Sequence, residues 1–126
     1  MVKLLELKAG AVMRVLELEV DGRSGTRELM DSLPEQTQRR FRVMFRLLAE
    51  TGRVGQGETG FRRLESVVYE IKEYSSNVRL FCFRWRHCVV VCTHGGKKPA
   101  GKAAYRREID KVLRLYELCR REGVLP

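Results

Sequence analysis

The stretch SVVYEIKEYSSNVRLFCFRWRHCVVVCTHGGKKPAG, residues 66–101, holds the strongest strand patterns in the chain. Apolar and polar side chains alternate over residues 66–74, and β-branched and aromatic side chains recur over residues 78–85. Residues 88–93 form an almost continuous apolar run, which is typical of a central strand. Because strands joined by short turns usually pair with each other, this stretch predicts three sequential antiparallel strands.

The residues before this sheet predict a strand followed by two helices. Residues 11–20 alternate as a half-buried strand does, and the ten residues before them can add a short strand that pairs with it. Residues 26–33 fit one or two turns of helix. A longer helix is predicted over residues 35–50, because Ser32 and Glu35 have the spacing of a capping box.

The rest of the chain completes a small α+β fold. Gly52 is the expected C-terminal cap of the long helix, and the glycine-rich residues 52–60 match no nucleotide-binding motif, so they are interpreted as a plain loop. Apolar residues at helical spacing predict a last helix over residues 103–122. A length of 126 residues, 44% of them apolar, predicts one domain, residues 1–126, with a central antiparallel sheet.

The net charge of +9 is unevenly distributed along the chain. Residues 1–38 hold more acidic than basic side chains, and no acidic residue occurs between Glu73 and Glu108. Cations without a counter-charge repel one another, and a phosphate backbone is the anion that usually joins them. The pattern therefore favours a nucleic-acid partner over a merely solubilising surface. The cations of the acid-free stretch are Arg79, Arg84, Arg86, Lys97, Lys98, Lys102, Arg106 and Arg107.

Several classes of protein are not favoured by the sequence. No apolar run approaches the roughly 20 residues needed to cross a bilayer, and the N-terminus lacks the uncharged centre of a signal peptide. We therefore expect a cytoplasmic protein without a membrane partner. The four cysteines and two histidines lack the paired spacing of structural zinc sites, so we expect no metal and no cofactor.

The run THGGKKPAG places two adjacent lysines, Lys97 and Lys98, on a glycine-hinged turn at the end of the apolar strand. Gly95 and Gly96 would let the backbone approach phosphates closely. If the strand persists through this run, alternation points the two lysines to opposite sides, so that only one of them reaches a given phosphate.

Five motifs follow one another along the chain: ELMDSLP, FRVMFRLLAETG, FRRLESVVYEIKE, NVRLFCFRW and VVVCTHGGKKPAGKAAYRREIDKVLRLYE. In this order they resemble the RelE/HigB toxin superfamily, and specifically its phage-derived HigB-like branch, over about residues 15–118. The resemblance implies a RelE-like fold and an endoribonuclease toxin of a type II toxin–antitoxin system. Such a toxin cuts mRNA in the ribosomal A site, so its expected partners are mRNA, the ribosome with its rRNA, and a helix-turn-helix antitoxin.

The resemblance also implies a set of catalytic residues, which are Lys72, Arg79, Lys97 and Lys98. The sequence departs from the family pattern where glycines precede the lysine pair, and where no aromatic or histidine tail follows the last helix. His94 is a further candidate for catalysis, as a general acid, although a histidine that ends an apolar strand is more often structural. The predicted RNA-binding residues are Arg84, Arg86, Lys102, Tyr105 and Arg106.

The chemistry expected of these residues is cleavage without a metal, in which the 2′-hydroxyl of the RNA attacks the adjacent phosphate. Fixed cations would stabilise the developing negative charge. Structural roles remain open for several of them: Arg79 can pair with Glu70 or Glu73 across the hairpin, Lys72 can be a solvated strand residue, and Tyr105 can belong to the core. The alternative function is a non-catalytic phage-derived protein that binds RNA or the ribosome on the same fold.

Overall fold

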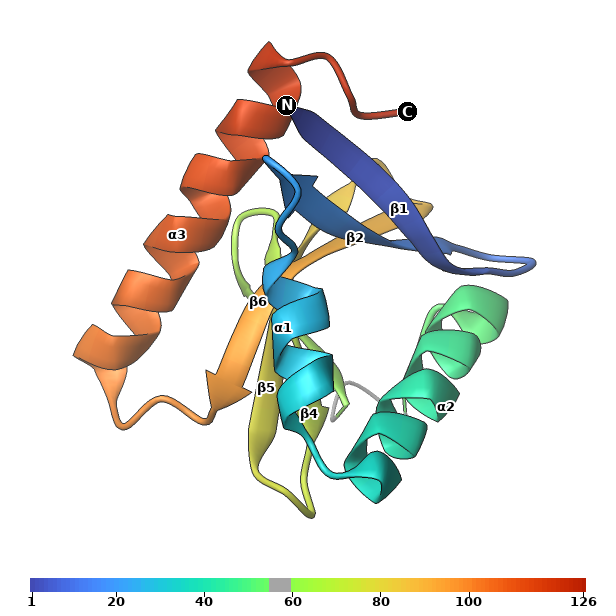
Figure 1. Cartoon of the computed structure of the whole chain (residues 1–126), viewed down its shortest axis with the longest axis vertical. Coiled ribbons are helices and arrows are strands. Elements are labelled where there is room, and N and C mark those ends of the chain that lie inside the picture. The colour runs from blue at the N-terminus through green and yellow to red at the C-terminus, as the bar shows by residue number, and fades with distance from the viewer. Residues whose placement is uncertain (55–59) are drawn as a thin grey trace.

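The computed structural model describes residues 1–54 and 60–126, and in them six strands and three helices form a single domain (Figure 1). The strands are β1 (Val2–Ala9), β2 (Arg14–Val20), β3 (Phe61–Glu65), β4 (Val68–Glu73), β5 (Val78–Trp85) and β6 (Val89–Lys97). The helices are α1 (Gly25–Ser32), α2 (Glu35–Thr51) and α3 (Lys102–Arg121). Part of the predicted glycine-rich loop, residues 55–59, lies outside the described residues.

All six strands join one open sheet in the order β1-β2-β6-β5-β4-β3. The three predicted sequential strands are β4, β5 and β6, and they pair antiparallel as expected. The N-terminal hairpin β1–β2 is added to β6 through a parallel pairing, in which Val15 lies opposite Val90. The central sheet is therefore mixed at this one junction.

The helices cover both faces of the sheet (Figure 1). On one face, α1 and α2 enclose a core that includes Leu29, Phe41 and Leu48. On the other face, α3 lays Ile109 and Val112 of its apolar stripe against the sheet. Each face of the sheet is thus largely apolar, and polar side chains on it must find partners.

The predicted α+β class is confirmed, but two local predictions were wrong. The Ser32 hydroxyl donates to the carbonyl of Leu29, 2.7 Å away, within α1, and α2 starts after Pro34 with no side-chain cap. The capping box is therefore absent. Strand β3 was not predicted, and a turn at Ser66 with φ of 51° separates it from β4. Gly52, with φ of 75°, ends α2 as expected.

No helix in the described residues has the length and apolar character needed to span a membrane.

Candidate functional site

A groove of about 560 Å³ opens between β3, the lysine turn and the first turns of α3. Its cations come from three separate segments, because β3 supplies Arg62, the turn supplies Lys98 and α3 supplies Lys102. The side chain of Tyr105, one turn into α3, is half-buried in the wall. The full lining consists of Arg62, Leu64, Lys98, Pro99, Gly101, Lys102, Tyr105, Arg106 and Ile109.

Glu70 on β4 is buried beside this groove and binds three of its neighbours. Its Oε2 accepts hydrogen bonds from Arg62, at 2.7 Å from Nη2 and 3.2 Å from Nε. Its Oε1 accepts a hydrogen bond from the Tyr105 hydroxyl at 3.1 Å and lies 3.3 Å from Nε of Arg79. Glu70 therefore ties β3, β5 and α3 together at one point of the α3 face.

The same contacts shift the protonation of the groups around Glu70. Hydrogen bonding to the Glu70 carboxylate raises the pKa of Arg62 above its usual value, although burial opposes this. Burial and the Glu70 carboxylate raise the pKa of Tyr105, whereas Arg79 opposes them. Both shifts favour a protonated arginine and a neutral phenol at rest.

Arg79 is the most enclosed cation of the cluster, with a side chain only 5% exposed. Its Nη1 donates to the carbonyl of Val78 at 3.3 Å, and its Nε has no hydrogen-bond partner in the described part of the chain, despite the nearby Glu70 oxygen. Glu70 is one of the two ion-pair partners that the sequence predicted for Arg79, the other being Glu73. The ion pair leaves donor capacity on the guanidinium.

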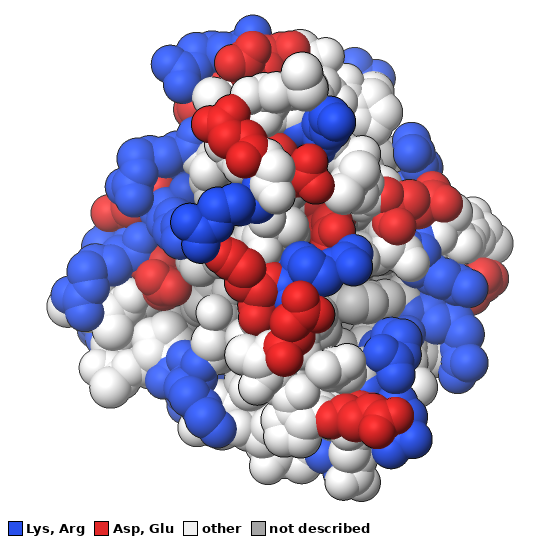
Figure 2. Space-filling model, viewed as in Figure 1, with Lys and Arg blue, Asp and Glu red and all other residues white. Residues whose placement is uncertain are grey.

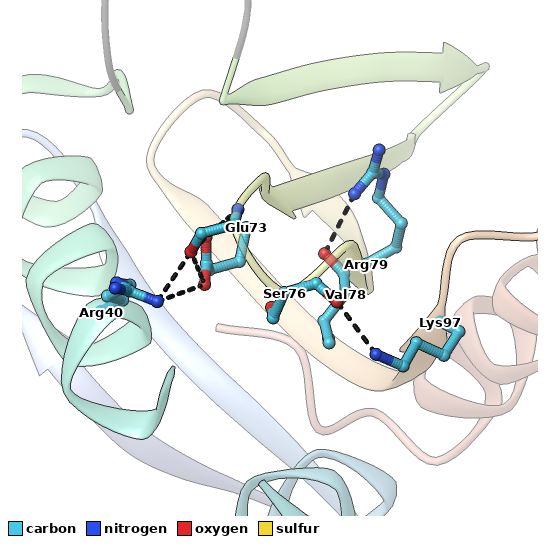
Figure 3. Close-up of polar contacts among 7 residues, drawn as sticks. Arg40, Glu73, Ser76, Val78, Arg79 and Lys97 are labelled. Carbon is cyan, nitrogen blue, oxygen red and sulfur yellow. Dashed lines mark hydrogen bonds and ion pairs between the residues drawn. The ribbon is translucent and has the colours of Figure 1, made fainter. Parts of the chain in front are cut away.

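The two lysines of the turn lie in different places, but β6 ends at Lys97, so the strand does not persist to Lys98 as the alternation argument required. Lys97 closes β6, and its ammonium donates to the carbonyl of Ser76 at 3.0 Å (Figure 3). Figure 3 shows Lys97 and Arg79 reaching away from each other. Lys98 instead lines the groove. The structure thus brings Lys98, and not Lys97, to the groove.

The two glycines before the lysines have different surroundings. A Cβ atom on Gly95 would lie 2.2 Å from the carbonyl oxygen of Arg79 and 2.7 Å from a Leu29 methyl, so this position must stay small for β6 to pack on β5 and α1. Gly96 pairs with Arg79 across the strands and has open space around its Cα. Only Gly96 has the free surface that close approach to a ligand would require.

Lys72 and Arg79 are cross-strand partners on the α3 face, and both lie beside the ring of Tyr74. The Lys72 ammonium is 5.3 Å from the ring centroid and the Arg79 guanidinium carbon is 5.8 Å from it. Tyr74 is 57% exposed. Lys72 and Tyr74 line a separate groove of about 680 Å³ against α2, which Arg39 and Arg40 also line, and neither lines the groove of Lys98.

His94 is buried on β6 and does not line the groove. Its Nδ1 lies 2.8 Å from the Thr93 hydroxyl and its Nε2 lies 3.2 Å from a carboxylate oxygen of Glu108. Burial and the charge of Lys111 lower the pKa of His94, and Glu108 opposes them. The ring is therefore held by neighbours on β6 and α3.

The predicted RNA-binding residues do not all gather in one place. Lys102, Tyr105 and Arg106 line the groove, whereas Arg84 and Arg86 lie at the β5–β6 turn, at the opposite end of β5 from Arg79. Arg84 donates to the carbonyl of His87 at 2.9 Å, and the Arg86 guanidinium carbon lies 5.3 Å from the ring of Trp85.

The acid-free stretch of sequence is not acid-free in space. Arg106 bonds Glu65 at 2.6 Å and Asp110 at 2.9 Å, and these hydrogen bonds raise its pKa further. Figure 2 shows acidic side chains interspersed among the basic ones on the face it presents. Counter-charges from β3, β4 and α3 thus neutralise part of the cationic run.

Sequence reasoning missed Arg62, Glu70 and Tyr74 as members of the site. Arg62 could not be placed without β3, which has only a weak strand pattern. Glu70 lies on the face of its strand that alternation marks as polar, and only the packing of α3 against that face shows that it is buried. Among the described residues, no three histidine, cysteine or acidic side chains gather to hold a metal ion.

Comparison with solved structures shows a shared fold. The crystal structure of the isolated E. coli RelE toxin superposes with a TM-score of 0.50 and 18% sequence identity, covering 81% of this chain and 99% of that one. No curated protein matches the sequence significantly.

A family model matches most of the chain. Residues 28–117 match the family described as phage derived protein Gp49-like, and this segment contains β3 to β6, α2, most of α3 and the whole groove. The chain has the RelE fold and belongs to the Gp49-like family of phage-derived proteins.

Proposed function

We propose that this protein is the toxin of a type II toxin–antitoxin system, a metal-independent endoribonuclease that cuts mRNA in the ribosomal A site. The observation that carries the proposal is the groove in which Arg62, Lys98 and Tyr105 converge from three segments beside the buried Arg79. The RelE fold and the Gp49-like family support a toxin-like mRNA interferase at the level of the family.

The groove offers cations that can stabilise the charge that develops in cleavage without a metal. The 2′-hydroxyl attacks the adjacent phosphate, and the pentavalent intermediate carries extra negative charge. Lys98 stands at the groove surface, where its ammonium can meet that charge. Arg79 lies behind it, with an Nε that has no hydrogen-bond partner among the described residues. Lys72 and the exposed ring of Tyr74 line a second groove, against α2, where a base can stack and a further phosphate can bind.

The proposed partners follow from this function. They are mRNA and the ribosome, whose phosphates match the cations of the groove, and a helix-turn-helix antitoxin that blocks the toxin. We propose that the protein acts in the cytoplasm, where translating ribosomes are found.

The test is cleavage of mRNA on programmed ribosomes, mapped by primer extension. We expect cuts within the A-site codon when the protein is added, and unchanged cutting after the protein is treated with EDTA and returned to constant magnesium. Intact mRNA under conditions in which the protein binds the ribosome would overturn the proposal. Activity that EDTA removes and zinc restores would overturn its metal independence.

The second candidate function is a non-catalytic protein that binds RNA or the ribosome. It is favoured by the groove lining, which in the described residues holds no carboxylate and no imidazole, and by the carboxylate partners of Arg79 and Arg106. Under this function, Lys98→Ala would weaken binding to ribosomes, and the wild-type protein would leave mRNA uncut.

A further inference from the structure

The proposed cleavage needs a group that removes the proton of the attacking 2′-hydroxyl. The described lining of the groove contains cations, apolar side chains and one phenol, but no carboxylate or imidazole. A protonated lysine or arginine has no lone pair with which to accept a proton. The proton must therefore leave the groove surface through Tyr105 or through a lysine that has first lost its own proton.

Tyr105 leads directly to a buried acceptor. Its side chain lines the groove, and its hydroxyl donates to Oε1 of Glu70, 3.1 Å away. Glu70 is 0% exposed, so it cannot touch an RNA strand itself. Any effect of Glu70 on the reaction must pass through a neighbour, and both Arg62 and Tyr105 contact Glu70 and line the groove. Of the two, only the phenol of Tyr105 has oxygen lone pairs that can accept a proton, because a guanidinium has none.

We propose that Tyr105 and Glu70 form a proton relay, in which the Tyr105 oxygen accepts the proton of the 2′-hydroxyl while the phenol passes its own proton to Glu70. The inference rests on the proposed function. Tyr105 is the catalytic residue of the pair, because it meets the substrate, and Glu70 is a positioning residue that acts through it.

The bonds and protons of this step balance. The 2′-O–H bond breaks as the bond from the 2′-oxygen to phosphorus forms, and the Tyr105 O–H bond breaks as Oε1 of Glu70 gains a proton. The bond from phosphorus to the 5′-oxygen then breaks, and the ammonium of Lys98 supplies the proton of the leaving oxygen. The products are a 2′,3′-cyclic phosphate and a 5′-hydroxyl, after which Glu70 returns its proton through Tyr105 to water and Lys98 regains one from water.

The cluster is built to keep this geometry. Arg62 from β3 occupies Oε2 of Glu70 with two hydrogen bonds, which leaves Oε1 directed at Tyr105. Arg79 from β5 adds a second positive charge next to Oε1, so the carboxylate is held from two strands at once. The raised pKa of Tyr105, caused by burial and by Glu70, keeps the phenol protonated until a base draws the proton away.

The experiment compares wild-type protein with Tyr105→Phe, Glu70→Gln and the double variant in single-turnover cleavage on programmed ribosomes. Two mRNAs are used, one natural and one in which sulfur replaces the bridging 5′-oxygen of the A-site codon. A sulfur leaving group needs no proton, so this substrate hides the loss of a general acid but not the loss of a base. Tyr116→Phe is the matched control, because Tyr116 lies on the same helix with its ring against Phe83.

We expect Tyr105→Phe and Glu70→Gln each to slow cleavage of both mRNAs by about 10²- to 10⁴-fold, with ribosome binding unchanged. The double variant should be no slower than the slower single variant, since both residues serve one step. Tyr116→Phe should cleave at the wild-type rate, and Lys98→Ala should recover much of its rate on the sulfur substrate.

Three results would overturn the relay while the wild-type protein still cuts mRNA. The first is a folded Glu70→Gln variant that cleaves at the wild-type rate. The second is a double variant whose loss of cleavage rate equals the product of the two single losses. The third is a Tyr105→Phe variant that recovers its cleavage rate on the sulfur substrate, which would make Tyr105 the general acid. If Glu70→Gln fails to fold, Tyr105→Phe decides the question, because it removes only a hydroxyl. A wild-type protein that cuts neither mRNA would overturn the proposed function, and the relay with it.

Discussion

The β5–β6 hairpin has cations at both ends, and the two ends use them differently. At the open end, Arg79 and Lys98 lie beside a groove, next to a buried carboxylate and a phenol. At the turn end, Arg84 and Arg86 are occupied by a backbone carbonyl and an indole ring. Similar charge in the sequence therefore yields a candidate site at one end and a surface feature at the other. What separates them is the depth of the side chains and the groups that converge around them.

The largest difference between the two ends should appear in cleavage by lysine and arginine variants. Lys98→Ala should reduce the cleavage rate by about 10²- to 10³-fold, or about 2.7–4 kcal/mol, because it removes a cation aimed at the transition state. Arg86→Ala, at the exposed turn, should change the rate little. The measurement is single-turnover cleavage together with thermal unfolding. Equal losses of cleavage rate in Lys98→Ala and Arg86→Ala would show that the two ends of the hairpin do not differ in function.

The lysine pair also allows a comparison within the open end. Lys97→Ala should slow cleavage much less than Lys98→Ala, because Lys97 bonds the Ser76 carbonyl on another side of the strand.

The next effect concerns stability. Arg79→Ala should lower the free energy of unfolding by about 3 kcal/mol, at the low end for a broken buried ion pair because Arg62 still holds Glu70. Arg84→Ala should cost less, since its guanidinium bonds a neutral carbonyl of the turn. Urea unfolding of both variants measures the difference. Equal urea midpoints for Arg79→Ala and Arg84→Ala would show that the buried ion pair of Arg79 adds no more to stability than the exposed hydrogen bond of Arg84.

A smaller effect is expected from the two glycines. Gly95→Ala should destabilise the fold by about 1–3 kcal/mol, because its Cβ would overlap the Arg79 carbonyl. Gly96→Ala should leave stability nearly unchanged, because nothing lies near its Cα. If Gly96→Ala nevertheless reduces cleavage, the open surface next to Arg79 belongs to the substrate path. Thermal unfolding of Gly95→Ala and Gly96→Ala measures the effect on core packing, and their cleavage rates measure the effect on access of the substrate.

The smallest effect concerns the two histidines. Because the pKa of His94 is lowered in the folded state, its neutral ring contributes stability above the unfolded value of about 6.5. That contribution is lost as the pH falls through the lower, folded pKa. His94→Gln should therefore flatten the fall in melting temperature between pH 7.5 and pH 5. His87→Gln, at the exposed turn, should retain the wild-type slope. A steeper dependence of melting temperature on pH in His94→Gln would contradict the lowered pKa of His94.

Much of the fold followed from periodicity, whereas the site depended on pairings that one sequence does not reveal. Alternation located β2, β4 and β5, because the direction of a side chain in a strand is a local property. Lys98 follows the last residue of β6, so alternation does not set its direction. The partners of Arg79 and Arg106 lie on other elements, so the charge run looked unbalanced when it was not.

Arg62 shows the same limit more sharply. Its role depends on β3, a short edge strand whose pattern is too weak to predict, and on the register that places it opposite Glu70. Likewise, only the packing of α3 reveals that Glu70, on the polar face of β4, is fully buried.

The parallel pairing of β2 with β6 affects the order in which the chain can fold during its own synthesis. The hairpin β1–β2 leaves the ribosome first, but the strand beside which it must lie, β6, is translated near the end. Until then, the core around Leu16 and Leu18 of β2 is incomplete, because β6 and α3 supply part of it. The groove needs the same late segment for Lys98 and Tyr105. A nascent or truncated chain that ends before α3 therefore lacks Tyr105 and the α3 wall of the groove.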